Sequence, residues 1–261
     1  MEIFGFCNIA LIPVRAMANH RSEMVTQLLF GEAYQIIDST PVVGWVEIKT
    51  QFDNYKGFVD IQQITLMHQS SFEKYYTSSK FDVSTSQMLI FDRKRNFSFF
   101  IPTGSSLPVN EEKTIQLGSE WFEIPKKIKQ EENSQHEILK HNALSFLNAP
   151  YLWGGRTYMG IDCSGLNQVI FKTIGVALPR DASQQISQGK TISSVEDAQL
   201  GDLAFFENKE GKITHTGIVW EDGNILHASG KVRIDKLDSQ GIFSLEKEEY
   251  THSLNTIKRI L

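Results

Sequence analysis

The sequence predicts an α+β chain, with a β-rich N-terminal half and helices at the start of the C-terminal half. Before residue 125, short apolar segments alternate with turn residues, as is typical of strands. From residue 134 on, apolar residues recur at helical spacing. A cysteine preceded by glycines, Cys163, stands before a second helical segment. The chain therefore combines a β-rich half with a candidate reactive thiol.

The strands predicted in the N-terminal half are rich in β-branched and aromatic residues. They are residues 34–37, 45–48, 57–59, 88–91, 97–101 and 121–124. The apolar stretch 3–14 is also interpreted as strand. Trp45-Val-Glu-Ile and Trp121-Phe-Glu-Ile are similar units 76 positions apart. This spacing suggests two copies of one small barrel.

A charged stretch, residues 125–133, is predicted to be a solvated linker. The Ser134-Gln-His-Glu137 pattern that follows is typical of a capping box at the start of a helix. The residues expected on the buried face of that helix are Ile138, Leu139, Ala143, Phe146 and Leu147. The C-terminal domain is therefore expected to begin near this helix.

Cys163 is predicted to start a helix, because helical spacing follows it and three glycines precede it. Free backbone N–H groups and the helix dipole should lower the pKa of a thiol there. The same N–H groups could hold the oxyanion of a tetrahedral intermediate. The alternative is a buried structural cysteine, which is the interpretation given to Cys7 in its apolar run.

Two histidines follow on predicted strands. His215 lies in Ile213-Thr-His-Thr-Gly-Ile-Val-Trp220, and His227 follows a hairpin signal at residues 221–224. Antiparallel pairing should bring the two rings together, with His215 as the base for Cys163 and His227 orienting it. Gly217 should leave space beside the imidazole. Two histidines and a cysteine could also bind zinc, but no fourth ligand lies nearby in sequence, so no metal or cofactor is expected.

The complete motif resembles the NlpC-type family of papain-like cell-wall cysteine peptidases. It runs Y-x-W-G-G-x-x-x-x-G-x-D-C-S-G-L from Tyr151, then H-T-G-I-V with its histidine 52 residues after Cys163, then L-H-A-S with its histidine 12 residues later. Leu-Pro-Arg-Asp at 178–181 and Gly-Asp-Leu at 201–203 also fit the family. The resemblance implies that Cys163, His215 and His227 are nucleophile, base and third polar residue.

Segments around residues 13–15, 29–32, 44–46 and 55–59 resemble a bacterial SH3-like domain. The expected domains are an SH3-like barrel at 1–68, a divergent second barrel at 69–128 and the peptidase at 129–261. This order resembles a branch of recycling endopeptidases that hydrolyse the γ-D-glutamyl to diamino-acid bond. Its substrate would be a peptide of the form L-Ala-γ-D-Glu-diamino acid, with a free N-terminus.

The resemblance also implies residues that bind substrate. Asp162, with Glu23 and Tyr55 of the first barrel, would hold the ammonium group of the peptide, and Ser164 would line the same site. Trp153 could form a wall of the cleft and Tyr151 could assist the oxyanion hole. Each has a structural alternative: a carboxylate that complements a helix dipole, a solvated glutamate, or aromatic packing.

Composition limits the remaining functions. The chain has 261 residues, 41% apolar content and a net charge of −5, which does not suit a nucleic-acid binder. Two cysteines provide no disulfide framework. A cytoplasmic monomer without a membrane span is expected; a trimmed or lipoprotein-type export signal involving Cys7 is the alternative. An acyltransferase, a wall-remodelling hydrolase and an inactive peptide-binding module are the rival functions.

Overall fold

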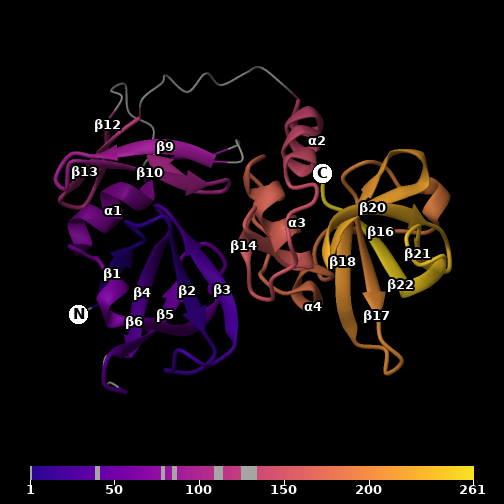
Figure 1. Cartoon of the computed structure of the whole chain (residues 1–261), viewed down its shortest axis with the longest axis horizontal. Coiled ribbons are helices and arrows are strands. Elements are labelled where there is room, and N and C mark those ends of the chain that lie inside the picture. The colour runs from indigo at the N-terminus through magenta and orange to yellow at the C-terminus, as the bar shows by residue number, and fades with distance from the viewer. Residues whose placement is uncertain (1, 39–41, 78–79, 84–86, 109–113, 125–133) are drawn as a thin grey trace. The chain divides into compact units, whose positions relative to one another are not determined.

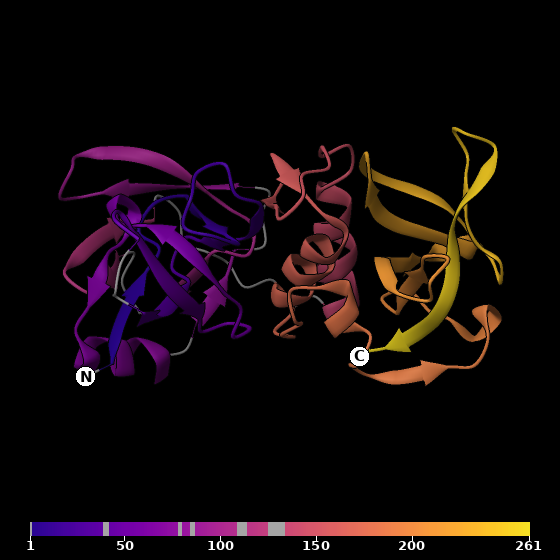
Figure 2. The same cartoon turned by 90° about the horizontal axis from the view of Figure 1, so that it is seen from below.

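The chain divides into two units, Met1–Asn133 and Ser134–Leu261. The computed structural model describes residues 2–38, 42–77, 80–83, 87–108, 114–124 and 134–261. Figures 1 and 2 show strands throughout the first unit, and helices beside a strongly curved sheet in the second. The predicted linker, residues 125–133, lies outside the described residues. No described helix combines the length and the apolar character that crossing a membrane requires.

The first unit begins with a seven-stranded antiparallel sheet in the order β3-β2-β6-β5-β4-β1-β7. Its strands are β1 (Ile3–Phe6), β2 (Leu11–Arg15), β3 (Met24–Leu29), β4 (Ala33–Asp38), β5 (Trp45–Thr50), β6 (Lys56–Asp60) and β7 (Leu66–Met67), with a 3₁₀ turn at Ile61–Gln63. Three of them confirm the strands predicted at 34–37, 45–48 and 57–59. The segment 3–14, interpreted as strand, contains β1 and most of β2; the strand is interrupted after Phe6, where the backbone of Cys7 bonds to Glu32 and Gly31.

Cys7 lies in the core of this sheet and is fully buried and unoxidised. Its neighbours in the apolar cluster are Ile12, Val14, Leu28, Tyr34, Val46, Ile48 and Val59. Burial raises the pKa of its thiol far above the usual value. Cys7 is therefore a packing residue, as its apolar sequence context predicted.

The rest of the first unit adds a four-stranded sheet, β10-β9-β13-β12, and a two-stranded one, β11-β8. The elements are α1 (Gln69–Thr77), β8 (Lys80–Asp82), β9 (Gln87–Asp92), β10 (Phe97–Pro102), β11 (Ser106–Pro108), β12 (Thr114–Leu117) and β13 (Glu120–Glu123). One apolar cluster joins Phe6 and Phe30 to Ile90 and Phe122, so the two sheets share a core. A second SH3-like barrel over 69–128 stays a prediction.

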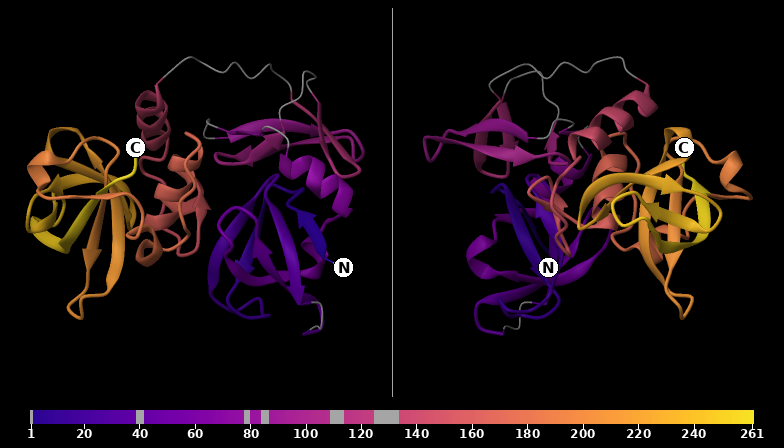
Figure 3. Two further views of the ribbon diagram at one scale, coloured as in Figure 1. Left: turned by 180° about the vertical axis from the view of Figure 1, so that it is seen from behind. Right: turned by 45° about the vertical axis from the view of Figure 1, so that its right-hand side comes forward.

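The second unit has its helices before its main sheet. They are α2 (Gln135–Ser145), α3 (Cys163–Lys172) and α4 (Ala182–Gln185), with a short hairpin of β14 (Arg156–Thr157) and β15 (Gly160–Ile161) before α3. Figure 3 shows the helices gathered against one side of the sheet. Contacts between α3 and β18 and between α2 and α3 join the two layers.

The sheet of this unit runs β16-β22-β17-β18-β19-β20-β21, and β21 also pairs with β22. Its strands are β16 (Lys190–Ile192), β17 (Leu203–Glu207), β18 (Ile213–Trp220), β19 (Asn224–Ser229), β20 (Lys231–Leu237), β21 (Gly241–Ser244) and β22 (Glu249–Arg259), with 3₁₀ turns at Val195–Asp197 and Glu221–Gly223. The extra pairing closes the strands from β17 to β22 into a barrel.

The capping box at the start of α2 is confirmed: Ser134 Oγ accepts from the Glu137 N–H, and the Glu137 carboxylate accepts from the Ser134 N–H at 2.8 Å. Of the residues predicted to face inward, Leu139, Ala143 and Phe146 are buried. Leu147 is exposed, because α2 ends at Ser145 and helical spacing no longer applies there.

Replacement of Ser134 by alanine should lower the free energy of unfolding of the second unit by about 1 kcal/mol, because the first turn of α2 loses its side-chain acceptor. Chemical denaturation of the whole chain measures this. His136→Ala, an exposed change in the same turn, is the control. Equal losses in both variants would contradict a capping role.

Candidate active site

Cys163 is the first residue of α3, and Asp162 is its N-cap. The thiol is only 5% exposed. Burial raises its pKa to about 12, and the Asp162 carboxylate adds to this, while Arg180 and the N–H groups of Thr216 and Ser164 oppose it. The helix start is therefore as predicted, but the predicted low pKa is wrong, because loss of solvation outweighs the helix terminus.

Asp162 is held by five donors. Oδ1 accepts from the Gly165 N–H at 2.7 Å and the Ser164 hydroxyl at 3.3 Å, and Oδ2 accepts from the Gly154 N–H at 2.8 Å. The guanidinium of Arg180, itself 1% exposed, donates to both oxygens. The carboxylate thus fastens the glycine loop and α3 together, while its predicted binding of a substrate ammonium stays a prediction.

Glycines on both sides of Cys163 are required by close backbone approach. A Cβ added to Gly165 would lie 2.4 Å from the Gly155 carbonyl oxygen, and one added to Gly155 would lie 2.3 Å from that of Gly160. Side chains there would push the loop away from α3. The glycine-rich motif is therefore a packing requirement that sets the position of Cys163.

His215 and His227 lie on neighbouring strands, β18 and β19, with His215 Nε2 2.9 Å from His227 Nδ1. This confirms that the hairpin brings the rings together. Gly217 makes the approach possible, because a Cβ there would meet the His227 Cβ at 2.8 Å. The space that Gly217 leaves thus admits His227.

A third histidine, His252 on β22, stacks on the ring of His215 with centroids 4.1 Å apart and planes 25° apart. Burial lowers the pKa of His215 well below its usual value, and His252 and His227 lower it further. Burial also lowers the pKa of His252 to about 4. Both rings are therefore neutral near pH 7.

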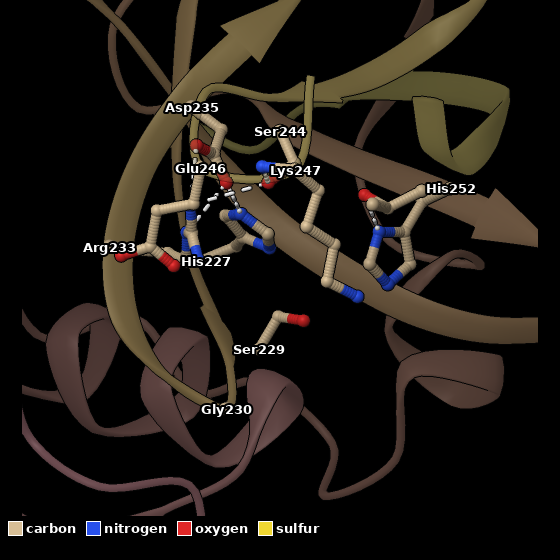
Figure 4. Close-up of a pocket in the computed structure, with 10 residues that line it drawn as sticks. His227, Ser229, Gly230, Arg233, Asp235, Ser244, Glu246, Lys247 and His252 are labelled. Carbon is tan, nitrogen blue, oxygen red and sulfur yellow. Dashed lines mark hydrogen bonds and ion pairs between the residues drawn. The ribbon is translucent and has the colours of Figure 1, made fainter. Parts of the chain in front are cut away.

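The histidine pair continues to a buried carboxylate, Asp235 on β20. His227 Nε2 lies 3.2 Å from Asp235 Oδ2. Although burial alone would raise the pKa of Asp235, hydrogen bonds from His227 and Arg233 hold it at about 2. Figure 4 shows His227, Asp235 and Arg233 on one side of a cavity of about 460 Å³, with His252 on the other and the Lys247 side chain between them.

Sequence reasoning missed Asp235, His252 and Arg180. A signal for Asp235 was present: the turn at Gly230 makes β20 antiparallel to β19, and the alternation of β20 places Arg233 and Asp235 on one face. His252 gave no such signal, because β22 reaches the site only through closure of the barrel.

Helix α3 is tied to the histidine strand by buried side chains. The Asn167 amide of α3 donates to Thr216 Oγ1 at 3.0 Å, next to His215, and Thr216 donates to the Ala204 carbonyl at 2.9 Å. Gln185 of α4 donates to the Ser164 carbonyl at 3.0 Å. These bonds fix the helix of the nucleophile against the strand of the base.

The other predicted residues of this unit surround the thiol to different degrees. Tyr151 donates its N–H to the Gly230 carbonyl at 3.0 Å, and burial and the nearby Cys163 raise the pKa of its hydroxyl, which stays protonated. Ser164 accepts from Arg180 at 2.9 Å. Trp153 is 58% exposed, which leaves its indole ring accessible to a ligand.

Glu23 and Tyr55 belong to the first unit. Glu23 is exposed directly before β3, and its carbonyl accepts from the Ala16 N–H at 2.9 Å. Tyr55 is half-buried in the turn between β5 and β6, where its N–H donates to Thr50 Oγ1 at 2.9 Å. Their part in binding a peptide amine stays a prediction.

Within the part of the chain that the structure describes, no group of three or more His, Cys, Asp or Glu side chains is arranged as a metal site. Each nitrogen that joins His215 to His227 is taken up by the other ring. The histidines therefore form a hydrogen-bonded chain, an arrangement suited to moving or holding a proton.

Residues 148–247 match the NlpC/P60 family, and residues 14–64 match the bacterial dipeptidyl-peptidase SH3 domain. The second unit is an NlpC/P60 domain. Its papain-like fold follows an N-terminal SH3-like domain, as the sequence predicted.

Two curated relatives share this domain. The γ-D-glutamyl-L-lysine dipeptidyl-peptidase of Bacillus subtilis (strain 168) is 37% identical over 136 residues, 51% of this chain and 43% of that enzyme. A protein of the same name from Bacillus cereus is 26% identical over 253 residues, 88% of this chain and 74% of the relative. The chain therefore matches less than half of the first relative and about three quarters of the second.

A solved structure shares the fold along almost the whole chain. The NlpC/P60 family protein from Bacillus cereus matches with a TM-score of 0.82 at 20% identity, covering 99% of each chain. At that identity the likeness concerns the fold alone. The order of an SH3-like part followed by an NlpC/P60 domain is thus present in both.

Replacement of Arg180 by methionine should lower the free energy of unfolding of the NlpC/P60 domain by about 3–5 kcal/mol, because Asp162 would remain buried without its cation. Urea denaturation measures this loss. Arg259→Met, which breaks a more exposed pair with Asp202, is the matched control and should cost less. Equal costs would contradict the central place of the Arg180 pair.

The NlpC/P60 domain should lose stability as the pH falls from 7 to 5. His215 and His252 have lowered pKa values in the folded state, so the unfolded chain takes up protons first and unfolding becomes easier. The expected loss is about 2 kcal/mol for buried His215 and less for the partly exposed His252. Denaturation at several pH values measures the slope. The slope of unfolding free energy against pH should be smaller in His252→Phe and unchanged in His136→Gln, an exposed control. An unchanged slope in His252→Phe would refute the contribution of His252.

Proposed function

We propose that the chain is a cysteine peptidase acting on peptidoglycan stem peptides, and that it hydrolyses the γ-D-glutamyl to diamino-acid bond. The observation that carries the proposal is the NlpC/P60 domain in which Cys163 begins α3, and α3 packs against β18, the strand of His215 in the His215–His227 pair. Two relatives named γ-D-glutamyl-L-lysine dipeptidyl-peptidases support the substrate class.

In the proposed mechanism, His215 is the base. Its Nε2 is engaged with His227, so Nδ1 is the nitrogen that takes the thiol proton. The pKa of the Cys163 thiol is raised and that of His215 is lowered, so both groups are neutral at rest. Proton transfer therefore accompanies the attack of Sγ on the carbonyl carbon, with no thiolate formed beforehand.

The attack forms an S–C bond and places negative charge on the carbonyl oxygen. The donors proposed for that oxyanion are the Cys163 N–H, which as the first residue of α3 has no helical partner, and the protonated Tyr151 hydroxyl. His215 then gives its proton to the leaving amine as the C–N bond breaks. Water then attacks the thioester and gives a proton to His215; as the C–S bond breaks, His215 passes that proton to Sγ.

The preference for a free N-terminus is the finer part of the proposal. It is supported by the match of residues 14–64 to the SH3 domain of bacterial dipeptidyl-peptidases and by the predicted roles of Glu23, Tyr55 and Asp162. A peptide with a free N-terminus is a product of wall turnover, so the corresponding cellular role is peptide recycling in the cytoplasm.

Turnover of L-Ala-γ-D-Glu-L-Lys and of its N-acetylated form tests both the peptidase activity and the preference for a free N-terminus. Release of lysine from the free peptide alone is expected, and it should vanish in Cys163→Ala, because the nucleophile is lost. Cys7→Ala is the matched cysteine control and should retain turnover, since Cys7 is a packing residue. Equal turnover of the two peptides would refute the amine preference, and turnover unaffected by Cys163→Ala would refute the peptidase.

A further inference from the structure

The hydrogen bonds of the site extend beyond the two predicted histidines to a third residue, Asp235. His215, His227 and Asp235 are joined by contacts of 2.9 Å and 3.2 Å. His227 and Asp235 are each 1% exposed. Direct contacts therefore run from the predicted base through His227 to a buried carboxylate.

The sheet itself builds this arrangement. Arg233 of β20 lies directly opposite His227 of β19, and Asp235 stands two residues further along β20, the diagonal position on the same face. Gly217 of β18 leaves the space that His227 occupies, and His215 lies two residues before it. Three adjacent strands thus place three side chains in one line across the sheet.

The carboxylate decides where the protons of both rings lie. An ionised carboxylate only accepts, so His227 must donate from Nε2 to Asp235. In the uncharged form of His227, this leaves a lone pair on Nδ1, which accepts from the Nε2–H of His215. Neutral His215 is left with a lone pair on Nδ1. The unprotonated Nδ1 of His215 that the proposed mechanism needs therefore follows from Asp235, the acceptor at the far end of the hydrogen-bonded series.

We propose that Asp235 is a positioning residue that sets the tautomers of His227 and His215, so that His215 presents an unprotonated Nδ1 to Cys163. This inference rests on the proposed function for its catalytic consequence, though not for the tautomers themselves. A side chain at position 235 that donates a hydrogen bond to His227 would switch both histidines to the other tautomer and place a proton on His215 Nδ1.

The other charged groups around His227 hold Asp235 in place. Arg233 donates to Asp235 Oδ1 at 3.1 Å and to Glu246 at 2.6 Å, and the Leu245 N–H donates to Oδ1 at 3.2 Å. Arg233 Nε also lies 2.7 Å from Oδ2, the oxygen that His227 contacts, so the guanidinium fixes both oxygens of the carboxylate. His252 and Lys247 face the same cavity, which Figure 4 shows.

The test compares Asp235→Asn with a matched control, Asp202→Asn. Asp202 is also a buried aspartate, paired with Arg259 at 2.8 Å and bonded to the Gln199 N–H at 2.8 Å, outside the histidine chain. Both variants lose the charge of a buried carboxylate that is paired with an arginine. Only Asp235→Asn should shift the histidine ¹⁵N resonances from the Nε2–H to the Nδ1–H pattern. Only this variant should also lower kcat by about 10- to 1,000-fold with little change in KM. The loss should be smaller than the ~10⁴-fold loss seen where an orienting aspartate contacts the base directly, because His227 lies between Asp235 and His215.

The outcomes separate the two proposals. The ¹⁵N shift needs no substrate, so it tests the tautomer assignment even if no peptide is turned over. Unchanged histidine tautomers in folded Asp235→Asn, or a kcat equal to that of Asp202→Asn, would overturn the role of Asp235. Asp235→Ala, which removes the acceptor without adding a donor, should leave a mixture of tautomers and an intermediate kcat; a kcat as high as that of the parent would also overturn it.

Discussion

The buried pairing of Arg180 with Asp162 is the interaction on which the second unit depends. One carboxylate accepts from the guanidinium, from the Gly165 N–H of α3 and from the Gly154 N–H of the glycine loop. Removing solvent from two charges is costly, and it is offset here because both carboxylate oxygens accept from Arg180 and from a backbone N–H. The position of Cys163 is a consequence of this cluster, since the residue follows directly on Asp162.

Burial also shapes the chemistry of the site. The thiol and the two stacked imidazoles are kept neutral, while the charges lie at the edges, in the pairs Arg180–Asp162 and Arg233–Asp235. Each edge pair fixes a geometry: the first fixes the nucleophile and the second the outer histidine. Cys163 and His215 are thus each positioned by an ion pair, one at the start of α3 and one on β20.

Much of this arrangement could be predicted from the sequence, because it depends on local patterns. The start of α3, the capping box of α2 and the hairpin that joins His215 to His227 follow from spacing and turn residues. The raised thiol pKa could not be predicted, since it depends on how deeply tertiary packing buries Cys163. The prediction that Leu147 is buried was wrong because sequence spacing does not show where a helix ends.

The long-range partners were equally hidden. Arg180 stands in a recognised segment, but nothing local shows that it reaches back to Asp162, 18 residues earlier. His252 reaches His215 only because β22 pairs with both β17 and β21. Such contacts depend on how a sheet closes, and short periodic patterns carry no information on that closure.

Closure through β22 has a consequence for the order of events during synthesis. The strand runs from Glu249 to Arg259 and pairs with both β17 and β21, which would otherwise be the edges of the sheet. It also carries His252, whose ring stacks on His215. A chain on the ribosome emerges from its N-terminus, so the first unit and α3 are available well before this strand. Until β22 docks, the barrel is open and His215 lacks its covering ring. The nascent chain therefore carries its nucleophile in an unfinished site, which is completed only when the last strand of the barrel is in place.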